Sequence, residues 1–176
     1  MSATDKIFLT GFMGSGKSTH GKKLAKLLQR PFIDLDNYIA GKENASVQEI
    51  FEKKGETFFR EKETEYLKQV IARYETSVVS LGGGAPCFHD NMDLLLKKGI
   101  VVYIKMPAEA LFSRLSQSAD ARPLLKNKND EEKLSFIKEL LQTRQPFYSK
   151  APVIVDGLNL TAEKLKEAIS LHIGKN

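Results

Sequence analysis

The chain has 176 residues, which suits one domain and excludes a multi-enzyme arrangement. Its composition, 41% hydrophobic and 28% charged, is that of a globular protein and excludes a disordered or collagen-like chain. The formal net charge of +5 leaves nucleic-acid binding open at this point, because basic side chains neutralise phosphates.

Short apolar runs alternate with longer helical segments along the chain. The runs are apolar at consecutive positions, which is typical of strands covered on both faces of a parallel sheet. We expect strands at residues 6–10, 31–34, 77–81, 99–104 and 152–155. The segments between them predict helices at about 17–28, 47–54, 56–74, 91–97, 108–115, 130–148 and 162–173. This alternation indicates an α/β fold with right-handed crossovers.

Two stretches depart from the alternation. Residues 37–74 are helical and long for one crossover, so we expect them to cap an edge of the sheet. Residues 116–129 are polar and aperiodic, which indicates a mobile surface loop. We expect a single domain over residues 1–176, and a monomer, because no apolar surface stripe is evident.

A phosphate-binding motif follows the first strand. Residues 11–19, GFMGSGKST, match G-x-x-x-x-G-K-[ST] between an apolar run and a helical segment. Glycines let backbone N–H groups wrap around phosphates, and the start of the next helix faces the same anion. In such a loop Lys17 reaches the β- and γ-phosphates and the Ser18 hydroxyl binds Mg²⁺. The motif predicts a nucleoside triphosphate site formed by Gly14, Ser15, Gly16, Lys17, Ser18 and Thr19.

Two aspartates, Asp34 and Asp36, end the second predicted strand. Strand alternation would place both carboxylates on one face of an extended segment, at the edge where α/β sheets bind ligands. Beside Mg·ATP, one carboxylate can hold the metal through its waters and the other can accept a proton from an attacking hydroxyl. The alternative is a helix N-cap followed by a solvated turn.

Two other features have a plain interpretation when each is taken alone. Arg60 and Glu63 share one face of a predicted helix and would form a surface ion pair of little energetic value. Gly82, Gly83 and Gly84 follow the third strand. They form either a flexible turn or a backbone that a ligand approaches closely.

The remaining candidates are single residues. Arg122 lies in the polar loop, either as a solvated side chain or as a group that closes on ATP to stabilise charge. Arg144 lies near the end of a long predicted helix, where its positive charge interacts favourably with the helix dipole. The three histidines have no metal-site spacing, and the only cysteine, Cys87, has no evident base partner, so we expect a structural thiol.

In combination, these segments resemble the shikimate kinase family over nearly the whole chain. The matching segments, in the family's order, are GFMGSGKST, DLD, IFEKKGETFFREKE, LGGGA, ARPLL and RQPFY. The resemblance implies a three-layer α/β/α phosphate-loop (P-loop) kinase fold with five parallel strands ordered 2-3-1-4-5. It implies a helical acceptor-binding insert over about 35–74 and a moving lid over about 116–129. It also implies transfer of the γ-phosphoryl group of ATP to the 3-hydroxyl of shikimate, with Mg²⁺, in aromatic amino-acid and chorismate biosynthesis.

The resemblance further implies roles for individual residues. The acceptor would be bound by Asp36, Arg60, Gly82, Gly83, Gly84 and Arg144, with both arginines on its carboxylate and Asp36 on its ring hydroxyls. Asp34 would lie in the outer shell of the Mg²⁺ bound by Ser18. Arg122 would contact the ATP phosphates, and Arg114 would stack on adenine. Lys17, Asp36 and Arg122 would act in catalysis.

Two alternatives remain beside this function. One is a kinase for another small polyol acid, such as gluconate, or for a nucleotide. The other is a nucleotide switch or a nucleic-acid-binding module that uses the basic surface. Most basic residues are lysines, however, and three of the six arginines fall in motifs for small anions, namely Arg60, Arg122 and Arg144. We therefore expect shikimate and ATP as partners, neither nucleic acid nor membrane, and, with one cysteine and no long apolar run, a cytoplasmic location.

Overall fold

The computed structural model describes residues 6–117 and 128–174. Its centre is a five-stranded sheet in the order β2-β3-β1-β4-β5, in which every neighbouring pair is parallel. The strands are β1 (Lys6–Thr10), β2 (Phe32–Asp34), β3 (Val78–Ser80), β4 (Gly99–Lys105) and β5 (Val153–Asp156). The expected strand order is confirmed, and each observed strand differs from its predicted bounds by a single residue at most at either end.

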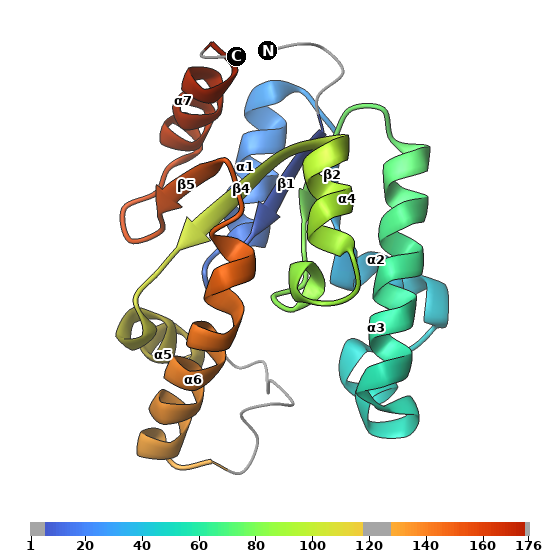
Figure 1. Ribbon diagram of the computed structural model, residues 1–176, viewed down its shortest axis with the longest axis vertical. Coiled ribbons are helices and arrows are strands. Elements are labelled where there is room, and N and C mark those ends of the chain that lie inside the picture. Colours follow the sequence, from blue (N-terminus) through green and yellow to red (C-terminus); the bar gives the residue numbers. More distant parts are fainter. Residues whose placement is uncertain (1–5, 118–127, 175–176) are drawn as a thin grey trace.

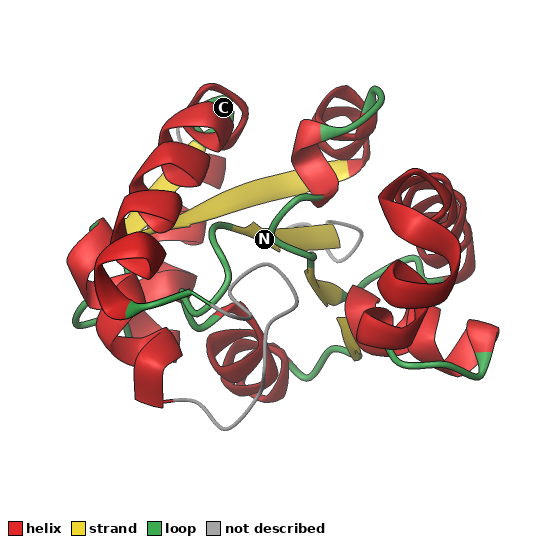
Figure 2. Cartoon of the chain, turned by 90° about the horizontal axis from the view of Figure 1, so that it is seen from below, coloured by secondary structure: helices red, strands yellow, loops and turns green. Residues whose placement is uncertain are grey.

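Helices lie on both faces of the sheet, which completes the three-layer α/β/α architecture (Figures 1 and 2). They are α1 (Lys17–Leu28), α2 (Leu35–Glu43), α3 (Val47–Arg73), α4 (Asn91–Lys98), α5 (Ala108–Gln117), α6 (Asp130–Tyr148) and α7 (Ala162–Ile173). A short 3-10 helix, η1 (Ala85–Cys87), precedes α4. Across the described residues, no helix combines the length and the apolarity that crossing a bilayer requires.

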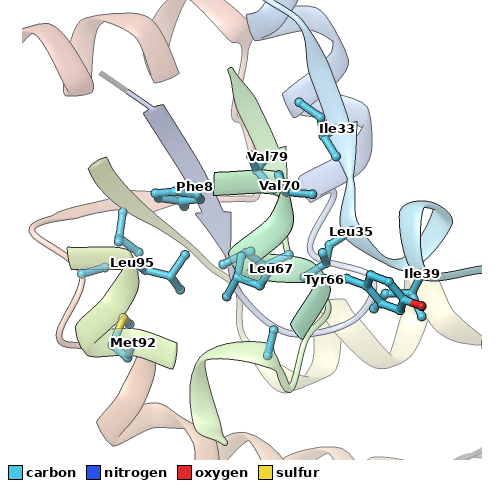
Figure 3. Close-up of a cluster of buried hydrophobic side chains, with 14 of the residues drawn as sticks. Phe8, Ile33, Leu35, Ile39, Tyr66, Leu67, Val70, Val79, Met92 and Leu95 are labelled. Atoms are coloured by element: carbon cyan, nitrogen blue, oxygen red, sulfur yellow. The ribbon is translucent and has the colours of Figure 1, made fainter. Parts of the chain in front are cut away.

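Neighbouring residues of the central strand β1 face opposite sides of the sheet. On one side Ile7 packs with Leu24 of α1, in a cluster that α7 completes. On the other side Phe8 packs with Leu67 of α3 and Leu95 of α4 (Figure 3). All five side chains are fully buried, so burial of apolar surface on both faces stabilises the sheet. The carboxyl ends of the parallel strands are thereby left to position polar groups at one edge.

The chain after β2 differs from the sequence-based expectation. Asp34 ends the strand and α2 begins at the next residue, so Asp34 and Asp36 do not alternate along an extended segment. Instead, Asp34 is the N-cap of α2, and its Oδ1 accepts a hydrogen bond from the Asn37 N–H at 3.3 Å. The signal for this helix is the spacing of Leu35 and Ile39, which are four residues apart and fully buried.

Helix α3 contains a break at the glycine where the sequence predicts a boundary between two helices. Gly55 has φ of 81° and ψ of 171°, a backbone conformation outside the helical region. The first part begins at a capping box in which Ser46 and Glu49 bond each other's backbone N–H groups. The second part carries Arg60 and Glu63, so the break sets the direction from which these two side chains reach the edge of the sheet.

Candidate active site

The loop between β1 and α1 allows a close approach to its backbone. Gly14 and Gly16 have φ of 79° and 92°, in the left-handed region that favours glycine. Helix α1 begins at Lys17, as predicted, and Lys17 Nζ donates to the carbonyl oxygens of Gly11 and Phe12 at 2.9 Å each. The ammonium group is therefore held against the loop, where a cavity of about 350 Å³ opens between the loop and the end of β3.

A cluster of oxygen atoms lies at the far side of this cavity. Ser18 Oγ donates to Asp34 Oδ2 at 2.5 Å and lies 3.1 Å from Ser80 Oγ at the end of β3. Carboxylate and hydroxyl oxygens are the ligands that Mg²⁺ prefers, so these residues fit that ion. Ser80, the last residue of β3, was not among the sequence-based candidates. The described residues contain no group of three or more His, Cys, Asp or Glu suited to a metal.

A second cavity, of about 90 Å³, adjoins the first on the side of α2 and α3. Its charged lining consists of Asp36, Arg60, Glu63 and Arg144, and its apolar lining includes Phe51 and Phe59. Three residues line both cavities, namely Met13, Asp36 and Gly83. Met13 was not among the sequence-based candidates, and it borders both cavities.

The Arg60 side chain is buried and held from several sides. Its Nε and Nη2 donate to Glu56 Oε1 at 3.2 and 3.1 Å, and its Nη1 donates to Glu63 Oε2 at 2.7 Å. The guanidinium also lies over the Phe88 ring, 4.3 Å from its centroid. The expectation of a surface ion pair with Glu63 is therefore wrong, because Arg60 is 6% exposed and Glu63 is fully buried.

Helix α6 brings a second arginine to the same cavity. Arg144 is 6% exposed, and its guanidinium lies 5.7 Å from the centroid of the Phe12 ring. The helix-dipole interpretation of Arg144 did not include this burial beside the cavity. One turn further on, the Tyr148 hydroxyl donates to the Gly83 carbonyl oxygen at 2.5 Å, a contact that joins residues 65 positions apart. This bond fixes the end of α6 against the loop after β3.

The glycine loop, residues 82–84, is packed so closely that no residue in it has room for a Cβ atom without displacement. A Cβ on Gly82 would lie 2.6 Å from Glu63 Oε1 and 2.8 Å from Asp36 Oδ1. A Cβ on Gly84 would lie 2.7 Å from both terminal nitrogens of Arg60. Charged side chains approach the backbone at Gly82 and Gly84, and the Met13 backbone nitrogen would lie 3.2 Å from a Cβ on Gly83. None of the three glycines has a left-handed conformation.

Burial changes the acid–base properties of this cluster. Removal from water raises the pKa of Glu63 to about 7, against the attraction of Arg60, which lowers it. Burial likewise raises the pKa of the nearby Cys87 thiol to about 11, which agrees with the expectation of a structural thiol. The sequence does not indicate that Glu63 is buried in this cavity, because its spacing from Arg60 is that of an ordinary ion pair on a helix surface.

Of the two arginines predicted to contact ATP, Arg114 and Arg122, only Arg114 lies within the described residues. Arg114 lines the larger cavity, with Nη1 3.4 Å from the Gly14 carbonyl oxygen and Nη2 3.3 Å from that of Gly157. It therefore connects the phosphate loop to the loop after β5. Arg122, and most of the expected lid over residues 116–129, lie outside the described residues.

The sheet order, the phosphate loop and the adjoining charged cavity define a P-loop kinase. Residues 13–173 match the shikimate kinase family, and the chain belongs to this family of ATP-dependent kinases. It is 46% identical over 167 residues to the shikimate kinase of Parabacteroides distasonis, a match that covers 95% of this chain and 93% of that one.

Solved structures agree with this assignment. The shikimate kinase of Bacteroides thetaiotaomicron superposes with a TM-score of 0.89 at 40% identity, over 94% of this chain and 98% of that one. A shikimate kinase of Acinetobacter baumannii in complex with shikimate gives a TM-score of 0.86 at 38% identity, over 99% and 95% of the two chains. A gluconokinase of Sinorhizobium meliloti, at 20% identity and a TM-score of 0.60, shares only the fold.

Proposed function

We propose that the chain transfers the γ-phosphoryl group of ATP to the 3-hydroxyl of shikimate, giving shikimate 3-phosphate and ADP. The observation that carries this proposal is that Asp36 lines both cavities. A donor phosphate held by the phosphate loop and an acceptor hydroxyl beside Asp36 would then be neighbours, as transfer between two bound molecules requires. Family membership and the shikimate complex of the Acinetobacter relative support shikimate as that acceptor.

The acceptor cavity has the charges that this substrate needs. Arg60 and Arg144 offer two planar guanidinium groups, which suit a carboxylate because they can donate parallel hydrogen bonds to it. Asp36 offers a carboxylate to the ring hydroxyls, and the glycine loop offers backbone that a small ring can approach. The helical insert, residues 35–74, thus supplies Asp36 and Arg60, two of these three charged side chains.

The nucleotide cavity would hold the triphosphate through the backbone N–H groups of the phosphate loop and Lys17. Arg114 would contact the adenine side, and Arg122 in the lid the transferring phosphate. Ser18 and Asp34 would hold Mg²⁺, which when bound supplies positive charge to the phosphates. The fit of the Ser18, Asp34 and Ser80 oxygens to this ion supports the assignment.

Asp36 is then the group that orients the attacking hydroxyl. A loose phosphoryl-transfer transition state demands little proton removal beforehand, so positioning is the larger part of its role. The proton released from the hydroxyl can pass to the Asp36 carboxylate and from there to water. We further infer that the enzyme works as a single-domain monomer in the cytoplasm, in agreement with its one cysteine and single continuous fold.

The test replaces Asp36 by Asn and measures steady-state ADP formation together with ATP binding. We expect turnover to fall by about 10²–10⁴-fold, the usual range for a positioned proton acceptor, with ATP affinity retained. Asp93→Asn, a change on the exposed surface of α4, is the control. Near-normal turnover of Asp36→Asn would refute this role. Faster ADP release with gluconate or a nucleoside monophosphate than with shikimate would refute the acceptor.

A further inference from the structure

The two carboxylate oxygens of Glu63 have different surroundings. Oε2 accepts a hydrogen bond from Arg60 at 2.7 Å. Oε1 is buried and has no hydrogen-bond partner within residues 6–117 and 128–174. It points to the glycine loop, 2.6 Å from where a Cβ on Gly82 would lie, and Asp36 Oδ1 is 2.8 Å from the same position. An unpartnered oxygen and a neighbouring carboxylate thus face the acceptor cavity together.

The described charges that face Glu63 do not balance if it is ionised when an acceptor is bound. Within residues 6–117 and 128–174, Arg60 on the same helix and Arg144 on α6 supply two positive charges, and Asp36 on α2 supplies one negative charge. Cys87 on η1 adds none, because burial raises its pKa to about 11. An acceptor carboxylate brings the second negative charge. Ionised Glu63 would be a third, buried without compensation, and such a charge is costly.

The raised pKa of Glu63 allows this side chain to take up a proton and so to restore the charge balance. Because burial raises its pKa to about 7, the free enzyme near neutral pH holds both forms of this side chain. A further negative charge in the cavity shifts the equilibrium toward the protonated form. The protonated Oε1 becomes a donor on the side of Asp36, while Oε2 remains an acceptor for Arg60. Protonation therefore gives the unpartnered oxygen a proton to donate and keeps the bond that positions Arg60.

We propose that binding of the acceptor carboxylate is coupled to uptake of one proton by Glu63, and that the neutral acid is the form that positions Arg60 for the acceptor. The proton comes from water or buffer and adds to Oε1, with no change of oxidation state. Glu63 is a positioning residue in this scheme, because it acts through Arg60. The inference rests on the proposed function, since it takes shikimate as the acceptor.

The coupling has a defined dependence on pH. Below about pH 7 Glu63 already carries its proton, so acceptor affinity is constant and no proton is taken up. Above this pH the free enzyme must first bind a proton, so the dissociation constant for shikimate rises by up to about tenfold per pH unit. The rise ends where Glu63 also ionises in the complex.

Isothermal titration of the complete wild-type chain with shikimate tests this directly. Titrations at about pH 8 in phosphate and in Tris, which differ in ionisation enthalpy, give the number of protons taken up. We expect a value approaching one at about pH 8 and near zero at about pH 6. Binding without uptake at the higher pH overturns the inference alone. An absence of shikimate binding overturns the proposed function and the inference with it.

Two variants assign the proton to Glu63. Glu63→Gln keeps an oxygen that can accept from Arg60 and cannot ionise, so we expect no proton uptake and no dependence of shikimate affinity on pH. At about pH 8.5 it should bind shikimate several-fold more tightly than the wild type, which loss of a merely structural contact would not produce. Glu56→Gln, at the exposed partner of Arg60, is the matched control and should retain the uptake. Uptake retained in Glu63→Gln would overturn the assignment.

Discussion

The nucleotide side and the acceptor side of this site are built in different ways. Half of the described residues that line the nucleotide side come from one continuous stretch, residues 11–19, whose backbone turns around a cavity and whose Lys17 bonds that same loop. The acceptor side is assembled from α2, α3, α6 and the glycine loop, which are far apart in the chain. A continuous site depends on local conformation, whereas an assembled site depends on packing between elements. Changes on the two sides should therefore separate the binding of the two substrates.

Among the changes that separate the two sides, the largest effect is expected on the nucleotide side. Lys17→Ala removes the cation that we expect to contact the transferring phosphate, and loss of one such group typically costs about 10²–10³-fold in turnover. Shikimate affinity, measured by titration, should stay within about twofold, because Lys17 does not line the acceptor cavity. The exposed Lys23 of the same helix provides the control, Lys23→Ala. An equal loss of shikimate affinity would show that the two sides are not separable.

On the acceptor side, Arg60→Lys retains the charge and loses the planar fork. We expect the KM for shikimate to rise by about 10–100-fold, the value of a charge-assisted bidentate contact, with the affinity for ATP unchanged. Steady-state kinetics with each substrate varied in turn measure both. A parallel weakening of ATP binding would contradict the separation.

A smaller effect is expected from a single methyl group. Gly84→Ala would place a Cβ 2.7 Å from the Arg60 guanidinium, so we expect about 1–3 kcal/mol lower stability and weaker shikimate binding. Gly41→Ala in α2 meets nothing within 4 Å and should instead raise the free energy of unfolding by about 0.5–1 kcal/mol. Denaturant titration of both variants gives the comparison. Equal stability of the two would show that the glycine loop tolerates a side chain.

The smallest effect concerns the oxygen cluster. Ser80→Ala removes the hydroxyl 3.1 Å from Ser18 Oγ and leaves Asp34 in place. Loss of about 1 kcal/mol, a typical single hydrogen bond, should raise the Mg²⁺ concentration needed for half-maximal activity by about fivefold. The KM for shikimate should not change. A change in that KM alone would place Ser80 on the acceptor side instead.

The sequence predicts the features that depend on neighbouring residues better than those that depend on packing between distant elements. The phosphate loop, the start of α1 and the break at Gly55 depend on neighbouring residues, and each lies where predicted. The Asp34–Asp36 pair was expected on one face of an extended segment, but α2 begins at Leu35, directly after the strand, and places Asp36 in helix geometry. The alternation expected for a strand does not indicate that a helix begins at Leu35.

Burial of the acceptor-side charges could not be predicted from spacing. Arg60 and Glu63 look like an ordinary surface pair until Phe88 and the glycine loop are packed against them. The bond from Tyr148 to Gly83 depends on where α6 ends relative to β3, which is a property of the whole topology. Family resemblance predicts Arg60 and Arg144 as site residues, but their buried surroundings depend on the fold.

The three residues that line both cavities also bear on the binding of compounds that would occupy both cavities at once. Since Met13, Asp36 and Gly83 border each cavity, a compound that joins a polyphosphate to a cyclic polyol acid needs only a short connection. Once one half is bound, the other half is held at an effective concentration of about millimolar or more, and its binding becomes intramolecular. A bisubstrate compound of this kind should bind more tightly than either part, provided that the connection leaves room for Asp36.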